Sequence, residues 1–448
     1  MSGQLTKKLS GWGRYPVAVC HTLRPERYAE LGSNSESSIA RGQGRAYGDA
    51  ALNTERQVVL TERLGRLRSF DAQSGVLRAE AGLTMQQLID FSLPQGWFPS
   101  VTPGTQFVSL GGCVAADVHG KNHHHDGAFS TSVMGFELID ADGGRRWCSR
   151  EENFDAFAAT VGGMGLTGII GEVELQMRRV ESAYIQATHH AADNLHAAFE
   201  LFEQHYDATY SVAWIDLQAR GAAQGRSVVM LGEHAPLERL SAAQQQSPFA
   251  IKARANRRVP FEMPGWLLNP LTIGAFNQLY YRIEGRRRTP FIIDYRKFFY
   301  PLDALSDWNR LYGRRGFLQY QCVVPRDGAQ QALSELLTTL AESRHPAFLG
   351  VLKKMGKTGE GLLSFPLEGY TLALDLPFSG DALLQLLQRF DAIVSNAGGR
   401  VYLAKDARLD SEMFRAMYPG VEPFIQSKGV LDPDGRFSSD LSRRLELG

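Results

Sequence analysis

The chain has 448 residues, of which 44% are hydrophobic and 21% charged, ordinary values for a globular protein that exclude a disordered one. Its 48 Lys and Arg residues balance 48 Asp and Glu residues. No net field therefore favours nucleic acid, and any attraction to an anionic surface must come from a local patch. The length predicts two domains.

The cysteines are far apart and form no CxxC pair: Cys20, Cys113, Cys148 and Cys322. This spacing predicts reduced, buried thiols in a cytoplasmic type of protein and argues against a disulfide framework or a zinc site. The first twenty residues contain no apolar signal region, and no later run is long enough to cross a bilayer. These observations do not exclude that the protein binds to the surface of a membrane.

In the first 180 residues the pattern predicts short strands with few helices. Strands are expected at 38–40, 57–61, 76–80 and 169–177, a hairpin at 135–145, and helices at 84–93 and 155–160. Thr84 is placed as the N-cap of the first helix.

Beyond residue 180 helices alternate with aromatic-rich strands, which predicts a second α+β domain with a broad sheet. Helices are expected at 194–204 and 327–342, with Asn194 and Asp327 as N-caps, and strands at 210–217 and 317–324. The polar tract 241–247 is expected to be a surface loop. A strand at 401–404, a helix at 411–417 and a final turn at Arg443 and Arg444 suggest a return to the first domain.

Glycine-rich turns recur three times in the first domain, at 41–49, 103–112 and 161–168. Because glycine lacks Cβ, consecutive amide groups can close around phosphate oxygens. The turns therefore predict a dinucleotide cofactor. The small-residue stretch that starts at Gly111 could hold a ring system, although such a run alone is more often tight helix packing.

Histidines gather just after this stretch, at His119, His123, His124 and His125, followed by Asp126. The spacing of His119 and His123 would suit a metal on a helix, but Gly120 interrupts it and no further carboxylate or cysteine completes a site. We therefore predict no metal and expect His119 to touch cofactor or substrate.

Three polar side chains of the second half are candidates for chemistry. Lys405 follows a short apolar run and could stabilise negative charge on a ring, or it could be a surface ion-pair lysine. Gln319 and Gln321 alternate along one strand and project to one face. They could grip sugar hydroxyls, or the face could be solvent-exposed.

Basic and aromatic residues are interleaved between positions 251 and 290. Such a mixture suits contact with anionic lipid headgroups. Ordinary connections with solvated arginines are an equal alternative.

Many motifs in order resemble the flavin oxidases of the vanillyl-alcohol-oxidase type. The resemblance runs from about residue 12 to the end, and the residues that carry it are Arg41–Asp49, Pro103–Thr105, Asp117–His124, Ala159–Gly163, Leu166–Ile170, Gly316–Gln321, Ala404–Asp406, Ala416–Pro419, Ser439–Asp440 and Arg443–Glu446. The members most similar to it act on a polyprenylphosphoryl ribose.

The resemblance implies an α+β fold with a two-subdomain, PCMH-type FAD-binding domain at 1–182, an inserted substrate domain on a broad antiparallel sheet at 183–399, and a returning segment at 400–448. Residues implied to contact FAD are Arg41, Gly42, Gln43, Gly44, Arg45, Ala46, Tyr47, Gly48, Asp49, Gly104, Ser109, Leu110, Gly111, Gly112, Ala116, Asp117, His119, Ile170 and Tyr402. Arg45 stands where many relatives carry a flavin-linking histidine, so non-covalent FAD is expected.

The resemblance further implies a catalytic role for Lys405, His119 and Tyr47. Residues implied to bind substrate are Lys121, Trp214, Gln319, Gln321, Lys353 and Lys405. The chain departs from the family pattern at Thr371, Phe299 and Ala373, where the family has asparagine, tyrosine and cysteine. The altered wall leaves the identity of the sugar or lipid open.

The implied reaction is FAD-dependent oxidation of the 2′-hydroxyl of a polyprenylphosphoryl-β-D-ribose to the 2′-keto sugar. A separate short-chain NAD(P)H reductase would then complete epimerisation to the arabinose donor of cell-wall arabinan. The enzyme is expected in the cytoplasm, with peripheral contact at the inner face of the plasma membrane. A soluble alditol or aldonolactone oxidase and a flavin-binding protein without catalytic activity are the alternatives.

Overall fold

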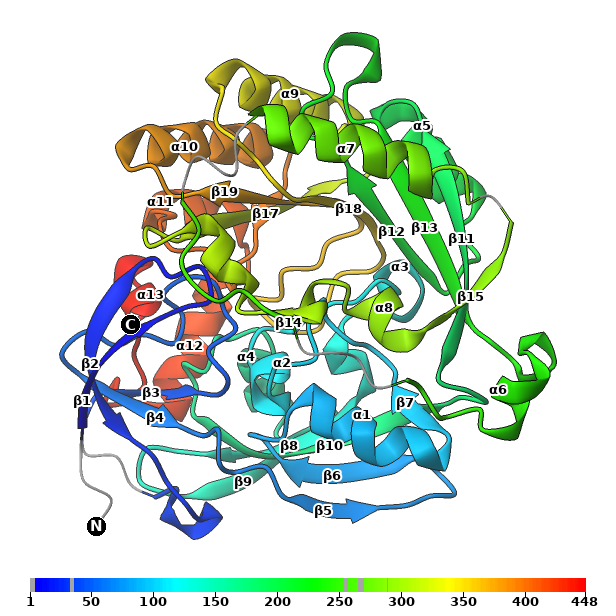
Figure 1. Cartoon of the computed structure of the whole chain (residues 1–448). Coiled ribbons are helices and arrows are strands. Elements are labelled where there is room, and N and C mark those ends of the chain that lie inside the picture. The colour runs from blue at the N-terminus through cyan, green and yellow to red at the C-terminus, as the bar shows by residue number, and fades with distance from the viewer. Residues whose placement is uncertain (1–4, 33–35, 253–256, 265–269, 288) are drawn as a thin grey trace.

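The computed structural model describes residues 5–32, 36–252, 257–264, 270–287 and 289–448. Its helices and strands form three sheets of four or more strands, with helices packed around them (Figure 1). The chain is thus a mixed α and β protein with several sheets, in agreement with the predicted α+β class.

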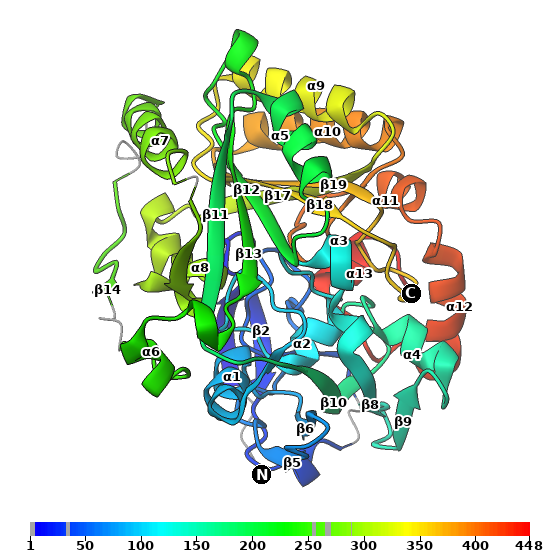
Figure 2. The ribbon, with the colours of Figure 1, turned by 90° about the vertical axis from the view of Figure 1, so that its right-hand side faces the viewer.

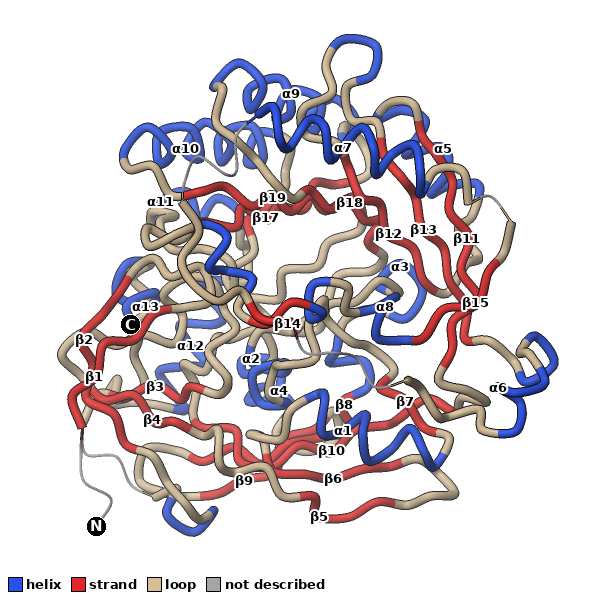
Figure 3. The backbone as a smooth tube through the Cα atoms, viewed as in Figure 1, coloured by secondary structure: helices blue, strands red, loops and turns tan. Residues whose placement is uncertain are grey.

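Two of these sheets are built from the first 180 residues. The four-stranded sheet has the order β1-β2-β4-β3, with strands β1 (Leu5–Ser10), β2 (Val17–Leu23), β3 (Ser38–Arg41) and β4 (Gln57–Leu60). The six-stranded sheet has the order β5-β6-β10-β8-β9, and β7 also pairs with β10. Its strands are β5 (Leu67–Phe70), β6 (Val76–Glu80), β7 (Trp97–Pro99), β8 (Val133–Ile139), β9 (Arg145–Ser149) and β10 (Ile169–Arg179). Both lie in the lower half of Figure 3.

The third sheet is antiparallel throughout and has the order β15-β11-β13-β12-β18-β19-β17-β20. Its strands are β11 (Tyr184–Ala192), β12 (Tyr210–Ile215), β13 (Ser227–His234), β15 (Phe291–Asp294), β17 (Phe317–Pro325), β18 (Gly350–Met355), β19 (Gly369–Pro377) and β20 (Arg400–Val401). A separate parallel pair joins β14 (Arg257–Arg258) to β16 (Leu305–Ser306).

Helices of the first part lie beside its sheets, several helices of the second part pack on the eight-stranded sheet, and the helix at 421–431 packs on the one at 154–160. The helices are α1 (Met85–Ser92), α2 (Leu110–Ala115), α3 (His123–Asp126), α4 (Phe154–Thr160), α5 (Leu195–Gln204), α6 (Ala242–Gln246), α7 (Pro270–Glu284), α8 (Tyr295–Phe299), α9 (Ala329–Ser343), α10 (Asp381–Asn396), α11 (Ser411–Met417), α12 (Val421–Leu431) and α13 (Asp440–Arg444). Helices α5 and α7 lie on opposite sides of strands β11 to β13 (Figure 2).

Strand register explains how the eight-stranded sheet separates a core face from a second face. Ala213, Leu352, Leu372, Cys322 and Val401 lie opposite one another on neighbouring strands and are buried in one core with α5, α9 and α10. Side chains alternate along a strand, so the adjacent row must point the other way.

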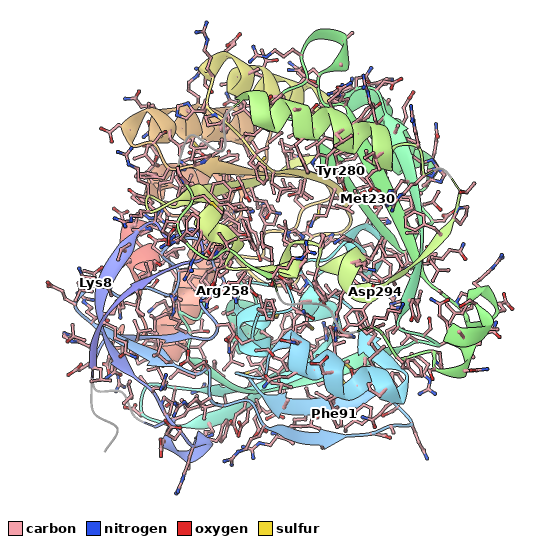
Figure 4. All side chains as sticks on the ribbon, viewed as in Figure 1. Lys8, Phe91, Met230, Arg258, Tyr280 and Asp294 are labelled. Carbon is pink, nitrogen blue, oxygen red and sulfur yellow. The ribbon has the colours of Figure 1, made fainter. Side chains whose placement is uncertain are left out.

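That adjacent row consists of Trp214, Val351, Ala373 and Gln321. Trp214 packs on Tyr280 of α7, with ring centroids 4.8 Å apart. Side chains fill the space between α7 and the sheet, where Tyr280 and Met230 are labelled in Figure 4. This second face is the one turned toward the first two sheets.

The C-terminal segment ties the two halves together. It leaves β20 at the edge of the large sheet and reaches the four-stranded sheet, where Phe437 bridges Ser38. Arg444 then pairs with Asp49 at 2.8 Å and with Asp406 at 2.9 Å.

The predicted strands and helices of both halves are confirmed, with four exceptions, one of which is that Arg443 and Arg444 lie in helix α13 rather than in a turn. Residues 242–246 form helix α6 rather than a loop, because Ser241 and Gln244 make a capping box. Gly328, not Asp327, caps α9. The strand expected at 401–404 ends at Val401, so Lys405 lies in a turn. All four cysteines are buried and unpaired, as predicted. Within the described ranges, no helix is long and apolar enough to span a membrane.

Candidate active site

A cavity of about 340 Å³ lies between the glycine loops and the second face of the eight-stranded sheet. On the loop side it is lined by residues of all three glycine-rich turns, among them Arg41–Tyr47, Pro103–Thr105, Ser109, Gly111, Gly112, Met164, Gly165 and Gly168. On the sheet side it is lined by Gln319, Gln321, Leu349, Val351, Lys353 and Ala373. Tyr402, Ala404 and Lys405 of the C-terminal segment complete it.

The first glycine loop supplies free hydrogen-bond donors. Among the residues that the structure describes, none accepts a hydrogen bond from the backbone N–H groups of residues 42–46. Gly44 has φ of +62°, which favours glycine, and a Cβ on Gly42 would lie 2.1 Å from the hydroxyl oxygen of Ser109. The loop is therefore a concave row of unbonded amides suited to an anion.

The second glycine-rich turn, at 103–112, contributes close packing rather than free hydrogen-bond donors. Ser109 caps α2 and accepts a hydrogen bond from the Gly112 N–H at 3.3 Å, and the Gly111 N–H donates to the Ala81 carbonyl at 2.8 Å. These N–H groups are already satisfied. Their missing side chains instead let the start of α2 form one wall of the cavity.

Arg45 and Tyr402 mark the two sides of the cofactor region. The guanidinium of Arg45 lies 4.1 Å from the centre of the Trp12 ring, and its buried Nε has no hydrogen-bond partner among the described residues. The Tyr402 hydroxyl donates to the Ala116 carbonyl at 2.8 Å, and its ring stacks on Phe365. An unbonded amide row, a buried guanidinium and ring-lined walls fit the pyrophosphate and rings of FAD.

A polar wall faces this region from the sheet. Lys353 Nζ lies 2.9 Å from His119 Nδ1, and Gln321 Nε2 lies 3.0 Å from His119 Nε2. Gln321 Nε2 also donates to the Thr371 hydroxyl at 3.2 Å. The prediction that Gln319 and Gln321 share one strand face is confirmed, since both line the cavity.

Lys405 occupies the other end of the polar wall, with its Nζ 3.7 Å from the centre of the Tyr47 ring. Burial lowers the pKa of Lys405 to about 7, although the negative charge of Asp375 opposes this shift. Burial and the neighbouring charges of Lys121 and Lys405 also lower the pKa of Lys353 to about 7. The wall thus holds lysines that titrate near neutral pH.

Asp375 is a site residue that the sequence analysis missed. It is fully buried, accepts a hydrogen bond from Gln319 Nε2 at 2.5 Å and another from the Tyr312 hydroxyl at 3.3 Å. Burial raises its pKa to about 6. The alternation of Thr371, Ala373 and Asp375 on β19 was the only available signal, and its meaning depended on the pairing of β19 with β17.

Several predicted contact residues do not line the cavity. Lys121 donates to the Phe299 carbonyl at 3.0 Å, and Trp214 extends the cavity-facing row toward α7. The predicted cofactor residues outside the cavity lining are Gly48, Asp49, Leu110 and Asp117.

These outlying residues have structural partners. Asp117 accepts hydrogen bonds from the Ser130 N–H and the Ser364 hydroxyl, and Asp49 pairs with Arg444. A Cβ on Gly48 would lie 1.7 Å from the Asp406 carbonyl oxygen. Gly48 therefore allows the first loop to pack on the C-terminal segment.

The histidine run is divided between the cavity and the core. His119 lines the cavity, whereas His124 donates from Nε2 to the Ala208 carbonyl at 2.8 Å and accepts at Nδ1 from the Ser211 hydroxyl at 3.3 Å. Within the described part of the chain, no group of three or more His, Cys, Asp or Glu side chains is arranged to hold a metal ion.

Comparison with known proteins agrees with this geometry. Residues 28–149 match the model of an FAD binding domain. The chain is 37% identical to the decaprenylphosphoryl-β-D-ribose oxidase of Mycolicibacterium smegmatis, over 99% of this chain and 98% of that protein. It is also 22% identical to the mouse L-gulonolactone oxidase, over 88% of this chain and 86% of that protein.

The glycine-lined cavity and the FAD binding domain together define an FAD-dependent oxidoreductase. Identity of 37% over nearly the full length of both chains then settles its family. The chain belongs to the decaprenylphosphoryl-β-D-ribose oxidase family.

Proposed function

We propose that the protein oxidises the 2′-hydroxyl of a polyprenylphosphoryl-β-D-ribose to the 2′-keto sugar, with FAD as the bound cofactor. The observation that carries this proposal is the cavity itself, in which a row of unbonded amides faces a wall of Lys405, Lys353, His119 and two glutamines. The amides suit the cofactor, and the wall suits a sugar with several hydroxyls.

Bound FAD would supply the hydride acceptor of this reaction. Residues 42–46 would hold its pyrophosphate, and Tyr402, Ile170 and the start of α2 would border its rings. Arg45 offers no nucleophilic ring nitrogen, which supports non-covalent binding.

The polar wall would orient the sugar and stabilise charge. Gln319 and Gln321 would bind hydroxyl groups, and the ammonium of Lys405 would stabilise negative charge that develops beside it. Burial and the charge of Asp375 raise the pKa of the Tyr47 hydroxyl well above its usual range. Tyr47 therefore stays neutral and supports Lys405 through its ring face.

The arrangement of the cofactor domain is part of the same proposal. The four-stranded and six-stranded sheets correspond to the two subdomains of a PCMH-type FAD-binding domain at 1–182. The eight-stranded sheet corresponds to the inserted substrate domain at 183–399, and residues 400–448 return to the first domain.

Peripheral contact with the inner face of the plasma membrane would bring the site to a lipid-linked sugar. Exposed apolar residues of α7 support it: Phe276, Leu279 and Ile283. Exposed arginines stand beside them, at 282, 286 and 287. Arg254, Trp266, Leu267, Leu268 and Arg288 of the same basic and aromatic segment lie outside the described residues.

A partner reductase is also proposed. A 2′-keto sugar is a product that a short-chain NAD(P)H reductase can reduce to the arabinose epimer, which would make the protein the oxidising half of an epimerase.

Bleaching of the flavin tests the substrate. Holoenzyme is mixed without oxygen with a short-chain polyprenylphosphoryl-β-D-ribose, and in parallel with L-gulono-1,4-lactone and a free alditol. Rapid loss of flavin absorbance with the phosphoryl ribose alone is the expected result. Bleaching by the lactone or alditol alone would establish the alternative sugar oxidase, and bleaching by none would overturn both.

A further inference from the structure

Four hydrogen bonds in the polar wall fix where each proton lies. The Thr371 hydroxyl lies 2.7 Å from the Cys322 carbonyl oxygen. Two oxygens so close require a hydrogen between them, and only the hydroxyl can supply it. The free lone pairs of Thr371 then face Gln321 at 3.2 Å, so the Gln321 atom there must be its amide nitrogen.

The same amide nitrogen sets the state of His119. It lies 3.0 Å from His119 Nε2, so this ring nitrogen must accept a hydrogen bond and carries no proton. The ring is therefore neutral, with its proton on Nδ1. Burial and the charges of Lys353, His123 and Lys405 also lower the pKa of His119 well below its usual range.

The Nδ1–H group of His119 points at Lys353 Nζ, 2.9 Å away. An ammonium group has three donors and no acceptor, so it could not accept this bond. Lys353 must therefore be an uncharged amine that accepts the bond with its lone pair.

The uncharged Lys353 amine beside the His119 Nδ1–H group is suited to bind an alcohol hydroxyl. His119 offers one donor and Lys353 one acceptor, and they satisfy each other across 2.9 Å. An alcohol hydroxyl is both acceptor and donor, so one hydroxyl can enter between them and satisfy both.

We propose that the substrate hydroxyl binds between His119 and Lys353, that the His119 Nδ1–H donates to its oxygen, and that Lys353 is the base that removes its proton. The inference rests on the proposed function. The O–H bond breaks and its proton bonds to Nζ. The electron pair of the neighbouring C–H bond leaves as hydride to the bound flavin, and the carbonyl double bond forms. The new carbonyl oxygen keeps the His119 hydrogen bond and gains one from the Lys353 ammonium.

The surrounding charges favour Lys353 as the base and Lys405 as the cation. The other titratable groups that act on His119 and Lys353 are Lys121, Lys405 and His123, and all are bases. Lys405 has the buried carboxylate of Asp375 as a countercharge, and Lys121 has Asp303. No carboxylate acts on Lys353 among the described residues. The countercharge of Asp375 favours the proton on Lys405, and Lys353, which has no such countercharge, is the lysine placed to act as base.

The first experiment measures flavin reduction in single-turnover mixing of holoenzyme with a short-chain polyprenylphosphoryl-β-D-ribose, from pH 5.5 to 9. The wild-type rate is expected to follow a bell-shaped profile centred near pH 7, with an acidic limb as Lys353 loses its proton and an alkaline limb as Lys405 loses its own. Lys353→Met is expected to lower the rate by about 10²- to 10⁴-fold, the usual contribution of a general base, and to remove the acidic limb.

The matched control is Lys354→Met. Lys354 is the next residue of the same strand, and its Nζ bonds to Glu203 at 2.7 Å, away from the cavity. Its rate and pH profile should equal those of the wild type. An acidic limb that survives in Lys353→Met, with a rate within threefold of wild type, would overturn the proposal. If the wild-type flavin is not bleached at all, the proposed function itself fails instead.

The second experiment does not depend on turnover and keeps the test open if Lys353→Met loses FAD. Lysine labelled with ¹³C at Cε is titrated by NMR in the wild type and in Gln321→Glu, with the Lys353 signal assigned by its absence in Lys353→Met. Wild-type Lys353 should titrate near pH 7. Gln321→Glu should raise this pKa, because a carboxylate accepts from His119 Nε2–H and leaves Nδ1 bare. A Lys353 that stays charged to pH 9 in the wild type would refute the assignment.

Discussion

The ammonium nitrogen of Lys405 lies 3.7 Å from the centre of the Tyr47 ring, over its face. The contact joins the first glycine loop to the C-terminal segment, since the Tyr47 N–H also donates to the Ala404 carbonyl at 2.9 Å. Burial lowers the pKa of Lys405 to about 7, and the negative charge of Asp375 opposes this shift. The expected effects of substituting Lys405 and Asp375 follow from this balance.

Lys405→Met should remove the cation that stabilises charge beside the flavin. Loss of one such preorganised electrostatic group lowers rates by about 10²- to 10³-fold. We expect at least this decrease in flavin reduction by the phosphoryl ribose, measured by stopped-flow absorbance on protein with an unchanged flavin content. A rate near that of wild type would show that Lys405 has no part in the reaction.

Asp375→Asn should shift the alkaline limb of the pH profile. The charged form of Lys405 is present below its pKa of about 7 and is lost above it, and Asp375 raises that pKa. Without the carboxylate, the pKa of Lys405 falls, so flavin reduction should decline at lower pH than in the wild type. Asparagine retains the acceptor for Gln319, so unfolding by denaturant serves as the control for a purely structural effect.

Gly42→Ala should weaken FAD binding. Its Cβ would lie 2.1 Å from the Ser109 hydroxyl oxygen, so either Ser109 must leave its capping position on α2 or the two loops must move apart. We expect the Kd for FAD to rise by about tenfold or more, equivalent to about 1.4 kcal/mol, measured by fluorescence on titration of apoprotein. Gly429→Ala is the matched control, because a Cβ there meets nothing within 4 Å. Equal affinity for FAD in the two variants would contradict the inference that the first glycine loop binds the cofactor.

Arg444→Met should destabilise the whole chain. Arg444 joins the last helix to the nearly inaccessible carboxylates of Asp49 and Asp406. Removal of one partner of such a pair costs about 3–5 kcal/mol, because the remaining charges stay buried. Urea unfolding should show this decrease. Arg415→Met, which removes an exposed pair with Glu422, should change the free energy of unfolding by no more than about 1 kcal/mol.

Local features of the fold were predictable because their signals lie within a few residues. Thr84 forms a complete capping box with Gln87, and the alternation of Gln319 and Gln321 set their shared face. The choice of Asp327 over Gly328 as N-cap failed because glycine at φ of +86° ends the preceding turn in a conformation that the pattern did not reveal.

Contacts within the site were less predictable because they join distant segments. His119 and Lys353 are 234 residues apart, and their contact depends on how two sheets face each other. Asp375 is 56 residues from Gln319 and meets it only through the pairing of β17 with β19. No local sequence pattern indicates which residues of β17 and β19 lie opposite each other. The resemblance placed individual residues in the site, but their proton positions required the hydrogen-bond geometry.

The C-terminal segment has a consequence for biosynthesis. Tyr402 and Lys405 complete the cavity, and α13 is bonded to the first glycine loop through Arg444 and Asp49. A nascent chain that has just exposed its N-terminal sheets therefore has only an open, incomplete cradle. Flavin capture during synthesis therefore requires residues 402–444, so most of the chain must be made before the cradle is complete.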